Sequence, residues 1–435
     1  MASTIAADTL YRQISINFIQ EILQDIHPVN FAIRLWDGTM IDPDPGCHAE
    51  FTIVLNHPGA LRKMFLPANE LTLGEAFIFE DFDIEGNIHA VFRLGDYIID
   101  SGMSLTKKLR QATRLLRLPS DTKPETADWQ PFQTTGLQHS RQRDRRAVQY
   151  HYDISNEFYK LWLGERMVYT CAYFASPDED LSTAQLRKLD YVCRKLELKE
   201  GETFLDVGSG WGGLVIHAAK YYGVKAVGVT ISEAQADWAR RFIKEEGLEK
   251  SCRIEICDYR DMQGQYDKIA TLGMYDHVGA KNLPFYYRKM WDVLKPGGRL
   301  FQDGSSSNVK NVPRRASFVG SYILPDGELV SFGNLLQMAE ETGFEVRDVE
   351  NLREHYALTL KWWADGIMAH KEEAHKYVDP VTYRIWLLHH AGAAYGFASG
   401  RTNNHHSILV KPDRGISNMP LHRDVWYRGE LRTTR

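Results

Sequence analysis

The sequence predicts an α/β protein, in which a doubly wound domain rich in parallel strands follows a smaller α+β domain. Strand-like and helix-like segments alternate from about residue 147 onward. A glycine-rich turn at 208–213 follows one of these strands and opens a helix. Residues 1–118 instead show short apolar alternations separated by turn-rich breaks. Because strands that alternate with helices pair in parallel, helices are expected on both faces of the second domain's sheet.

The composition is that of a soluble globular protein, with 43% hydrophobic and 25% charged residues. A net charge of −5 gives no reason to expect a nucleic-acid partner. The five cysteines contain no CxxC pair, and no metal site is predicted. No apolar run approaches the ~18 residues of a membrane span, and the first residues do not have the pattern of an export signal. We therefore expect a cytoplasmic protein, peripheral at the inner membrane surface.

The predicted α+β domain spans 1–118. Alternation in 31–40 and 49–55 predicts strands, and Asp37-Gly38 predicts a hairpin turn. The segment 104–119 has helical periodicity, with leucines on one face, five Lys and Arg residues and no acidic residue. Such a helix is a candidate for docking on an anionic membrane, so this is a candidate lipid-docking domain. The alternative is a helix that packs on the core and exposes its basic face.

Residues 119–146 are polar and aperiodic, which is typical of a linker, and they end in a basic run of Arg141, Arg143, Arg145 and Arg146. The doubly wound domain is expected over 147–411, and a polar tail over 412–435. The predicted strands of the domain are 202–208, 225–231, 252–258, 266–273 and 299–305, and its predicted helices are 214–223, 232–247 and 283–294. In such sheets the ligand binds at the carboxyl ends of the strands.

The turn in LDVGSGWGG (205–213) predicts close approach of the backbone to a ligand, because glycine has no Cβ. No lysine follows Gly213, which argues against a triphosphate cradle. Asp206 immediately before the turn would repel a pyrophosphate and favour a cationic or amine-bearing ligand.

Polar residues also follow the next two strands, which end in VTISEAQ (229–235) and CDYRD (257–261). This pattern resembles the Rossmann-like class I fold of S-adenosylmethionine-dependent methyltransferases. The resemblance implies that Gly208 and Gly210 hold the methionine part of the cofactor, and Asp206 is also expected to bind the cofactor. It implies contacts from Thr230 and Gln235 at the second strand, and from Asp258 and Tyr259 at the adenine edge.

Longer segments resemble cyclopropane-fatty-acid synthases and related fatty-acid C-methyltransferases. These are QYHYDISNEFYKLWLGERMVYTCAYF (149–174), FLDVGSGWGGL (204–214), CDYRDMQGQYDKIATLGMYDHVGAKN (257–282) and REHYALTLKWW (353–363). With weaker similarity back to 71–86, nearly the whole chain is covered. The resemblance implies methyl transfer to the double bond of an unsaturated phospholipid acyl chain, giving a cyclopropane. It also implies an acyl-binding insertion in the second domain and a homodimer.

The same resemblance implies roles for individual residues. Tyr169 and Thr170 match a cofactor-contacting pair, and His151, Tyr152 and Asp153 lie in the segment that caps the cofactor. In the family a bound bicarbonate ion removes the final proton. Its pocket maps onto Cys171, Asp276, Gln302, Gly304 and Tyr356.

Three departures concern that last step. Asp276 stands where the family usually has Glu, and Gln302 and Gly304 stand where many members have His and Ile. A family cysteine falls on Ala393, and no cysteine follows Cys257. A methylene- or methyl-branched product is therefore an alternative to the cyclopropane. A further alternative is an amine methyltransferase using Asp276 and His277, and the last is a lipid- or cofactor-binding protein without activity.

Overall fold

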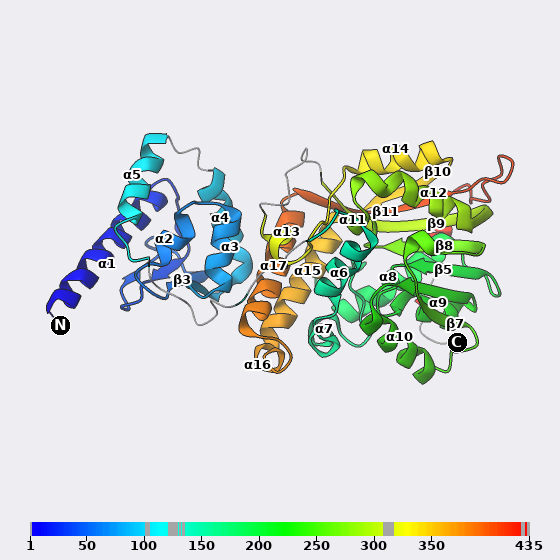
Figure 1. The fold of residues 1–435 in the computed structure, drawn as a ribbon, viewed down its shortest axis with the longest axis horizontal. Coiled ribbons are helices and arrows are strands. Elements are labelled where there is room, and N and C mark those ends of the chain that lie inside the picture. The colour runs from blue at the N-terminus through cyan, green and yellow to red at the C-terminus, as the bar shows by residue number, and fades with distance from the viewer. Residues whose placement is uncertain are drawn as a thin grey trace. The chain divides into compact units, whose positions relative to one another are not determined.

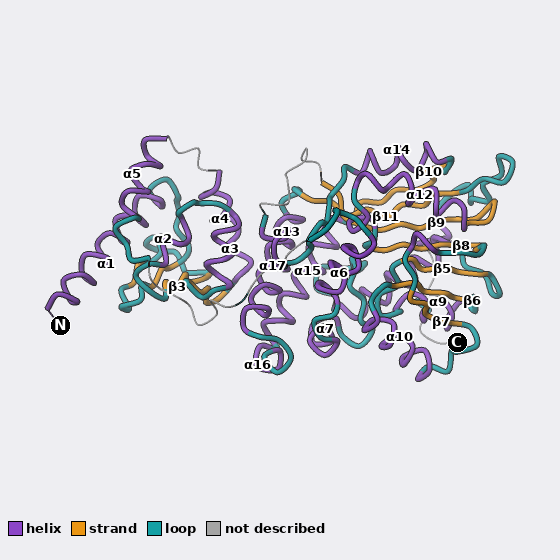
Figure 2. Tube along the Cα trace, viewed as in Figure 1, coloured by secondary structure: helices purple, strands orange, loops and turns teal. Residues whose placement is uncertain are grey.

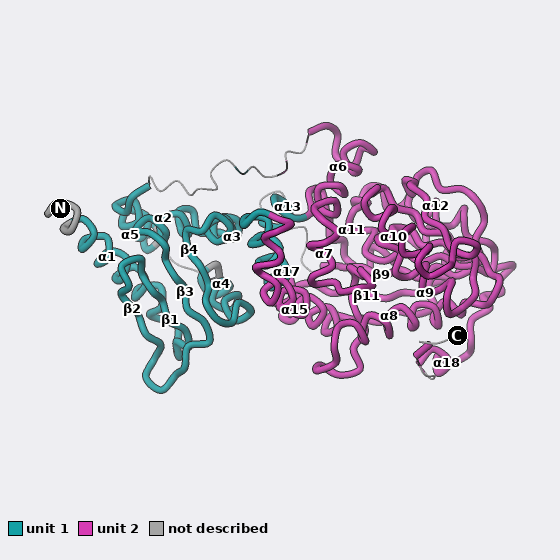
Figure 3. Tube along the Cα trace, turned by 90° about the horizontal axis from the view of Figure 1, so that it is seen from below, with its two compact units in different colours: residues 1–131, 316–323, 379–392 teal, residues 132–315, 324–378, 393–435 magenta. Residues whose placement is uncertain are grey.

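A computed structural model gives the fold of residues 2–100, 105–120, 129, 132, 135–307, 317–427 and 431–432 (Figures 1 and 2). The chain forms two compact units that are not consecutive in sequence. Unit 1 comprises 1–131, 316–323 and 379–392, and unit 2 comprises 132–315, 324–378 and 393–435 (Figure 3). The domain boundaries expected from the sequence stay predictions, since each unit takes segments from several parts of the chain.

Unit 1 is the expected α+β module. Its four-stranded sheet has the order β2-β1-β3-β4, formed by β1 (Ala32–Arg34), β2 (Met40–Ile41), β3 (Phe51–Leu55) and β4 (Phe82–Gly86). The hairpin predicted at Asp37-Gly38 is confirmed, because β1 and β2 pair antiparallel and Gly38 has a φ of +87°. Side chains of β3 alternate between buried and half-buried, as the apolar alternation predicts. The helices of its first segment are α1 (Ala2–Leu23), α2 (Ala60–Phe65), α3 (Glu70–Ile78), α4 (Val91–Asp100) and α5 (Leu105–Leu115).

Two later segments complete unit 1. Helix α13 (Phe318–Tyr322) packs on α3 so closely that a Cβ on Gly74 would lie 2.4 Å from the Phe318 ring. The Tyr322 hydroxyl donates to Glu75 at 2.8 Å. At the start of α17 (Pro380–Ala398), Arg384 is buried and its Nε donates to the Phe77 carbonyl at 2.7 Å. The residues before position 132 therefore do not supply all of this unit's packing.

The predicted basic helix forms as α5, but its apolar face is only partly covered. Leu115 and Leu118 are buried, whereas Leu109 and Leu116 are 60% and 54% exposed. Arg110 and Arg114 form ion pairs with Glu21 of α1. The basic helix thus pairs part of its charge within the unit and presents two leucines to solvent.

Among the described residues, unit 2 contains a seven-stranded sheet of order β10-β11-β9-β8-β5-β6-β7 (Figure 1). Its strands are β5 (Thr203–Val207), β6 (Lys225–Thr230), β7 (Cys252–Ile256), β8 (Tyr266–Leu272), β9 (Leu294–Ser307), β10 (Glu345–Asn351) and β11 (Thr402–Val410). Strands β5 to β9 pair in parallel, and β11 is antiparallel to both β9 and β10. The doubly wound, parallel-rich prediction is confirmed.

Helices cover both faces of this sheet (Figure 2). Apolar side chains of α8 (Leu181–Leu196), α9 (Gly213–Tyr222) and α10 (Glu233–Glu245) form one core with Phe204, Ala270 and Phe301. Side chains of α12 (Leu283–Val293) and α14 (Phe332–Thr342) form the other with Leu205, Ile269 and Leu300. The remaining helices of unit 2 are α6 (Arg141–Tyr152), α7 (Asn156–Leu163), α11 (Tyr275–Val278), α15 (Arg353–Ala369), α16 (Lys371–Ala374) and α18 (Asp424–Tyr427).

The segments predicted as a linker and as a polar tail both contribute to the packing of unit 2. The basic run that ends the predicted linker is the first half of α6, while 121–128, 130, 131, 133 and 134 lie outside the described residues. In the predicted tail, Trp426 is buried and its indole donates to Glu197 at 3.3 Å. Within the described ranges, we find no helix with the length and apolar character needed to span a bilayer.

Candidate active site

The glycine turn predicted to hold a ligand lies at the carboxyl end of β5. The backbone amides of Gly208 and Ser209 donate to the Val229 carbonyl at 3.0 and 2.9 Å, which folds the turn back against β6. Gly208 and Gly210 have φ values of +79° and +52°, a region that favours glycine. Asp206 before the turn is buried, and burial raises its pKa to about 7, against the opposing charge of Lys188.

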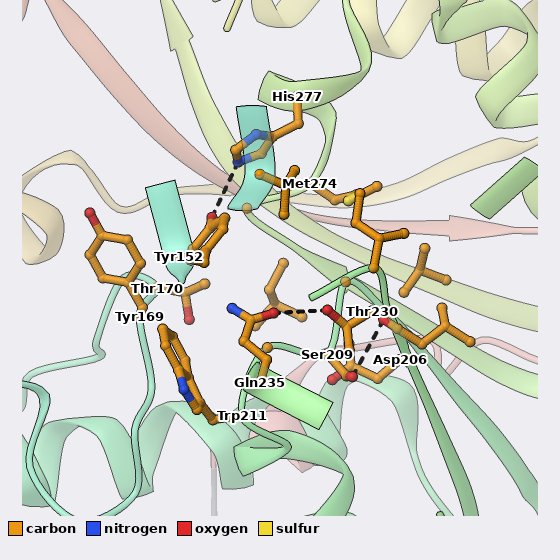
Figure 4. Close-up of a pocket in the computed structure, with 18 of the residues that line it drawn as sticks. Tyr152, Tyr169, Thr170, Asp206, Ser209, Trp211, Thr230, Gln235, Met274 and His277 are labelled. Atoms are coloured by element: carbon orange, nitrogen blue, oxygen red, sulfur yellow. Dashed lines mark hydrogen bonds between the residues drawn. The ribbon is translucent and has the colours of Figure 1, made fainter. Parts of the chain in front are cut away.

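The second strand end supplies a pair of hydrogen-bonded side chains. The Thr230 hydroxyl donates to Oε1 of Gln235 at 2.8 Å (Figure 4). Ser232 caps α10 by accepting from the Gln235 amide at 3.1 Å, and its own hydroxyl donates to Asp153 at 2.5 Å. Ser232 thereby connects Asp153, at the end of α6, to the second strand end.

The third strand end is organised by Arg260. Its guanidinium donates to both carboxylate oxygens of Asp258, at 2.8 and 2.7 Å, and to Asp144 of α6 at 3.0 Å. Burial by itself raises the pKa of Asp258, but the bonds from Arg260 outweigh it and the pKa is lowered. Asp258 is therefore an ionised carboxylate held in place beside Tyr259.

Aromatic side chains gather beside these strand ends. The rings of Tyr169 and Trp363 are 4.8 Å apart, and those of Tyr159 and Trp211 are 4.9 Å apart. We call His151, Tyr159, Trp162, Tyr169, Trp211 and Trp363 the aromatic cluster. Next to it, the Tyr152 hydroxyl lies 3.2 Å from Nε2 of His277 (Figure 4).

One pocket joins these features. All nine predicted cofactor residues line it: Tyr169, Thr170, Asp206, Gly208, Gly210, Thr230, Gln235, Asp258 and Tyr259. Tyr152 and His277 also line it, and Figure 4 shows them facing each other across one side. Sequence reasoning missed Lys188, Arg260 and Met274, which also line this pocket. Arg260 follows a predicted strand end and could have been found there, whereas Lys188 lies inside a helix with no local motif.

The residues predicted for proton removal do not line this pocket, and the structure brings only some of them together. Cys171 is buried, and its Sγ lies 3.3 and 3.9 Å from the carbonyl oxygens of Ala172 and Leu352. Burial raises the pKa of Tyr356 well above its ordinary value, and charge at Cys171 and Asp276 adds to this effect. Charge at Cys171 and at Asp276 therefore disfavours ionisation of Tyr356.

Gln302 and Gly304 do not join them. Gln302 is fully buried on the α12 face, where its Oε1 accepts from the Tyr287 hydroxyl at 3.1 Å. A Cβ on Gly304 would lie 2.5 Å from the Tyr275 ring, which therefore fills the space beside it. Because side chains alternate along a strand, Asp303 between them faces the other way. Burial raises the pKa of Cys171 and of Tyr356, and charge at Asp303 adds to this effect at both residues.

Comparisons with known proteins agree with this arrangement. A family model described as mycolic acid cyclopropane synthetase matches residues 139–407, and a domain of unknown function matches 18–101. A probable fatty acid methyltransferase of Pseudomonas putida is 36% identical over 413 residues, covering 93% of this chain and 98% of that protein. A probable fatty acid methyltransferase of Mycobacterium tuberculosis is 32% identical over 412 residues, covering 91% of this chain and 94% of that protein.

Solved structures resemble a large part of the chain. A cyclopropane synthase from Mycobacterium tuberculosis superposes with a TM-score of 0.59 and 27% identity, over 61% of this chain and 97% of that one. A mycolic acid cyclopropane synthase in complex with S-adenosylhomocysteine (SAH) and CTAB gives a TM-score of 0.58 and 28% identity, over the same shares of 61% and 97%. The class I methyltransferase fold expected from the strand ends is confirmed.

Proposed function

Since this chain belongs to the mycolic acid cyclopropane synthetase family, we propose that it methylates a double bond in an unsaturated phospholipid acyl chain, with a cyclopropane as product. The methyl donor of the family is S-adenosylmethionine, and a neighbour binds its product SAH. The observation that carries the proposal is the pocket itself, where all nine residues expected to hold this donor meet beside the aromatic cluster.

The pocket fits S-adenosylmethionine. A Cβ on Gly208 would lie 3.1 Å from the Met274 sulfur, so the glycine keeps open the space in which a ligand can approach the turn. Asp206 offers a carboxylate to a cationic amine, and Thr230 with Gln235 offers polar groups at the second strand end. When bound, this donor supplies an electrophilic methyl group.

The aromatic cluster suits the other half of the reaction. Attack by an alkene on a methyl group leaves positive charge on carbon, and water would trap that cation. Ring faces such as those of Tyr169 and Trp363 stabilise positive charge without offering a nucleophile. Their close packing also excludes water. The cluster thus provides the environment that alkene methylation needs.

A methylene- or methyl-branched product is the second candidate. It is favoured by the two relatives that cover more than nine-tenths of this chain, since both are named as probable fatty acid methyltransferases. The position of the family cysteine holds Ala393, which also weakens the case for an unchanged cyclopropanating site. Methyl transfer is common to all these outcomes. A cyclopropane and a methylene branch differ in which proton the substrate loses, and a saturated methyl branch requires in addition the reduction of the methylene branch by a separate reductant.

Docking on a membrane surface is part of the proposal. A phospholipid acyl chain is reached from a bilayer, and α5 offers exposed Leu109 and Leu116 among basic residues. Each cation near anionic headgroups adds roughly 1 kcal/mol of attraction. The exposed face of α5 therefore supports docking at the bilayer surface.

The test is turnover of purified protein on vesicles of unsaturated phospholipid. We expect release of SAH and a gain of one CH2 unit per modified chain by mass spectrometry, with derivatisation separating ring from branched products. Vesicles of saturated phospholipid are the matched control and should give no turnover. Methylation of soluble amines without vesicles would instead support the amine methyltransferase alternative. Binding of SAH without turnover on any lipid would support a binding protein.

A further inference from the structure

The residues predicted to hold a bicarbonate ion are not arranged to do so, which raises the question of which group accepts the final proton. The resemblance to cyclopropane synthases implies a bound bicarbonate ion, but the residues expected to hold it do not fit. Gln302 is turned toward Tyr287, and the space beside Gly304 is filled by the Tyr275 ring. The Sγ of Cys171 lies near two backbone carbonyls. What remains includes Asp276, whose side chain is one methylene shorter than the glutamate that the family usually has there.

A carboxylate of this chain occupies the same neighbourhood. Asp303 lies on β9 in register with Leu272 of β8 and His406 of β11. It is 2% exposed, and Nδ2 of Asn404 donates to its Oδ1. Burial raises its pKa to about 6, against the opposing charge of Lys188 and the bond from Asn404. The protein therefore has, in Asp303, a carboxylate whose pKa of about 6 suits a general base near neutral pH.

Contacts connect Asp303 to the pocket and to the predicted proton-removing residues. Its carbonyl accepts from the amide of Gly273, a lining residue, at 2.9 Å. Its side-chain partner Asn404 accepts through its own carbonyl from the Leu352 amide at 2.7 Å, and Leu352 in turn contacts Cys171. Asp303 thus lies directly behind the pocket wall, on the side of Cys171.

Lys188 of α8 balances the charges here. Its ammonium donates to the Thr170 hydroxyl at 2.6 Å, and its charge opposes protonation of both Asp206 and Asp303. His406 lies 3.7 Å from Asp303, but burial lowers its pKa well below the ordinary value, so it is neutral. One cation therefore faces two carboxylates, and an added bicarbonate would bring a further negative charge into a buried, already anionic site.

We propose that the carboxylate of Asp303, and not a bound bicarbonate ion, accepts the proton that the substrate loses after methylation. This inference rests on the proposed alkene methylation. A C–H bond of the cationic acyl chain breaks, and its electron pair forms the third ring bond of a cyclopropane or the double bond of a methylene branch. The proton goes to Asp303 and from there to water. Lys188 is a positioning residue that keeps Asp303 ionised.

The experiment compares wild type, Asp303→Asn and Asp303→Ala in CO2-free buffer, with and without added bicarbonate or acetate. We expect wild-type turnover on unsaturated vesicles to be the same with and without bicarbonate. Asp303→Asn should lose about 100-fold or more in turnover, the size of a general-base contribution, and bind SAH within about twofold of wild type. In Asp303→Ala, acetate or bicarbonate should restore part of the lost turnover. Thr271→Val, on the neighbouring strand β8 and hydrogen-bonded to Tyr286 of α12, is the matched control and should keep wild-type turnover.

Two results would overturn the inference while leaving the proposed function standing. One is wild-type turnover that falls about tenfold or more when bicarbonate is removed. The other is an Asp303→Asn variant that turns over within about threefold of wild type. Melting curves and SAH binding establish that each variant is folded, and if Asp303→Ala fails to fold, the isosteric Asn variant and the bicarbonate response decide. A wild-type protein that is inactive on every unsaturated lipid would refute the proposed function itself.

Discussion

Lys188, Asp206 and Asp303 form a group of buried charges beside the cofactor pocket. Each is at most 3% exposed, and burial shifts the pKa of each toward neutrality, to about 8, 7 and 6 respectively. Such groups exchange protons near neutral pH, which makes them suited to catalysis and costly for stability. The residues that we assign to the reaction should therefore be ones whose replacement stabilises the fold.

We expect Asp303→Asn to be more stable than wild type at pH 8. Since its pKa is raised on folding, the folded state binds more protons than the unfolded state between the two pKa values. The free energy of unfolding of wild type therefore falls as pH rises through about 4 to 7, and the penalty is complete above that range. The variant should gain on the order of 1–3 kcal/mol at pH 8 and little at pH 4, measured by urea unfolding. A gain that is equal at both pH values would contradict this account.

Replacing Cys171 with Ser or Tyr356 with Phe should lower turnover while leaving SAH affinity nearly unchanged. Neither residue lines the cofactor pocket, and charge at Cys171 acts on Tyr356. The expected loss is about 10- to 100-fold, the worth of one hydrogen bond to a charged group. Steady-state kinetics and calorimetric titration with SAH measure the two quantities. Equal losses of turnover and SAH affinity would place both residues in the cofactor site instead.

At the residue scale, the residues predicted to bind the cofactor share one pocket, whereas those predicted for proton removal lie outside its lining. Strand-end residues such as Thr230 and Asp258 are fixed by chain order, because each parallel strand delivers its end to the same edge of the sheet. Gln302 lies within a strand, where a shift of one residue turns every side chain to the opposite face. Burial of Lys188 depends on tertiary packing and has no local signal.

At the element scale, α6 is held over the pocket by ion pairs. Arg143 pairs with Asp326, and Asp144 with Arg260, and all but Arg143 line the pocket. At the other end of the linked segment, Asp153 accepts from Ser232. The first half of this helix was predicted as the end of a linker because its composition is polar, and only the packing of its charges makes it part of the site.

Arg260→Gln should weaken SAH binding by about tenfold or more. The substitution removes charged hydrogen bonds to Asp258 and Asp144, which hold the third strand end and α6, and each bond is worth about 1.5–3 kcal/mol. Arg141→Gln, on α6, is the control. Its ion pair with Asp261 is exposed, and such pairs contribute little. Titration calorimetry should show a loss for Arg260→Gln alone, and similar losses in both variants would argue against a specific role for Arg260.

Vesicle binding should depend on the exposed face of α5. Leu109→Ser with Leu116→Ser should reduce binding to anionic vesicles by about tenfold or more, since burying one leucine is worth about 1.5–3 kcal/mol. Lys107→Glu with Arg117→Glu should weaken binding more strongly at low salt than at high salt. Leu10→Ser, on α1 and 46% exposed, is the control for a leucine elsewhere on unit 1. Sedimentation with vesicles measures each effect, and unchanged binding in the leucine variants would assign α5 to an ordinary solvent-exposed face.

At the scale of the whole molecule, the sheet order followed from alternating strands and helices, whereas the composition of unit 1 did not. Its later segments are joined to it by contacts such as that of Arg384 with Phe77, which are more than 300 residues apart in sequence. The hydrophobic periodicity of a segment does not indicate which distant segment it contacts. Gly74 is a second example, because a side chain at this position would collide with the Phe318 ring, which is distant in sequence.

A fragment of residues 1–131 should be less stable than unit 1 within the full chain. The fragment lacks Arg384, which donates to the carbonyls of Phe77 and Phe82. It also lacks Tyr322, whose hydroxyl donates to Glu75. It also exposes apolar surface that α13 covers. We expect a lower melting temperature and faster amide exchange in α3 than in the intact protein. A fragment whose α3 exchanges as slowly as in the full chain would contradict this expectation.

The divided origin of unit 1 also constrains how such a protein can be recombined with its relatives. A single genetic crossover after position 131 would join the first stretch of one parent to the two completing stretches of another, at 316–323 and 379–392. Such a hybrid would mix side chains that must match across one core, as Gly74 matches Phe318. Exchange of this module between homologues is therefore expected to succeed only when all three stretches are inherited together.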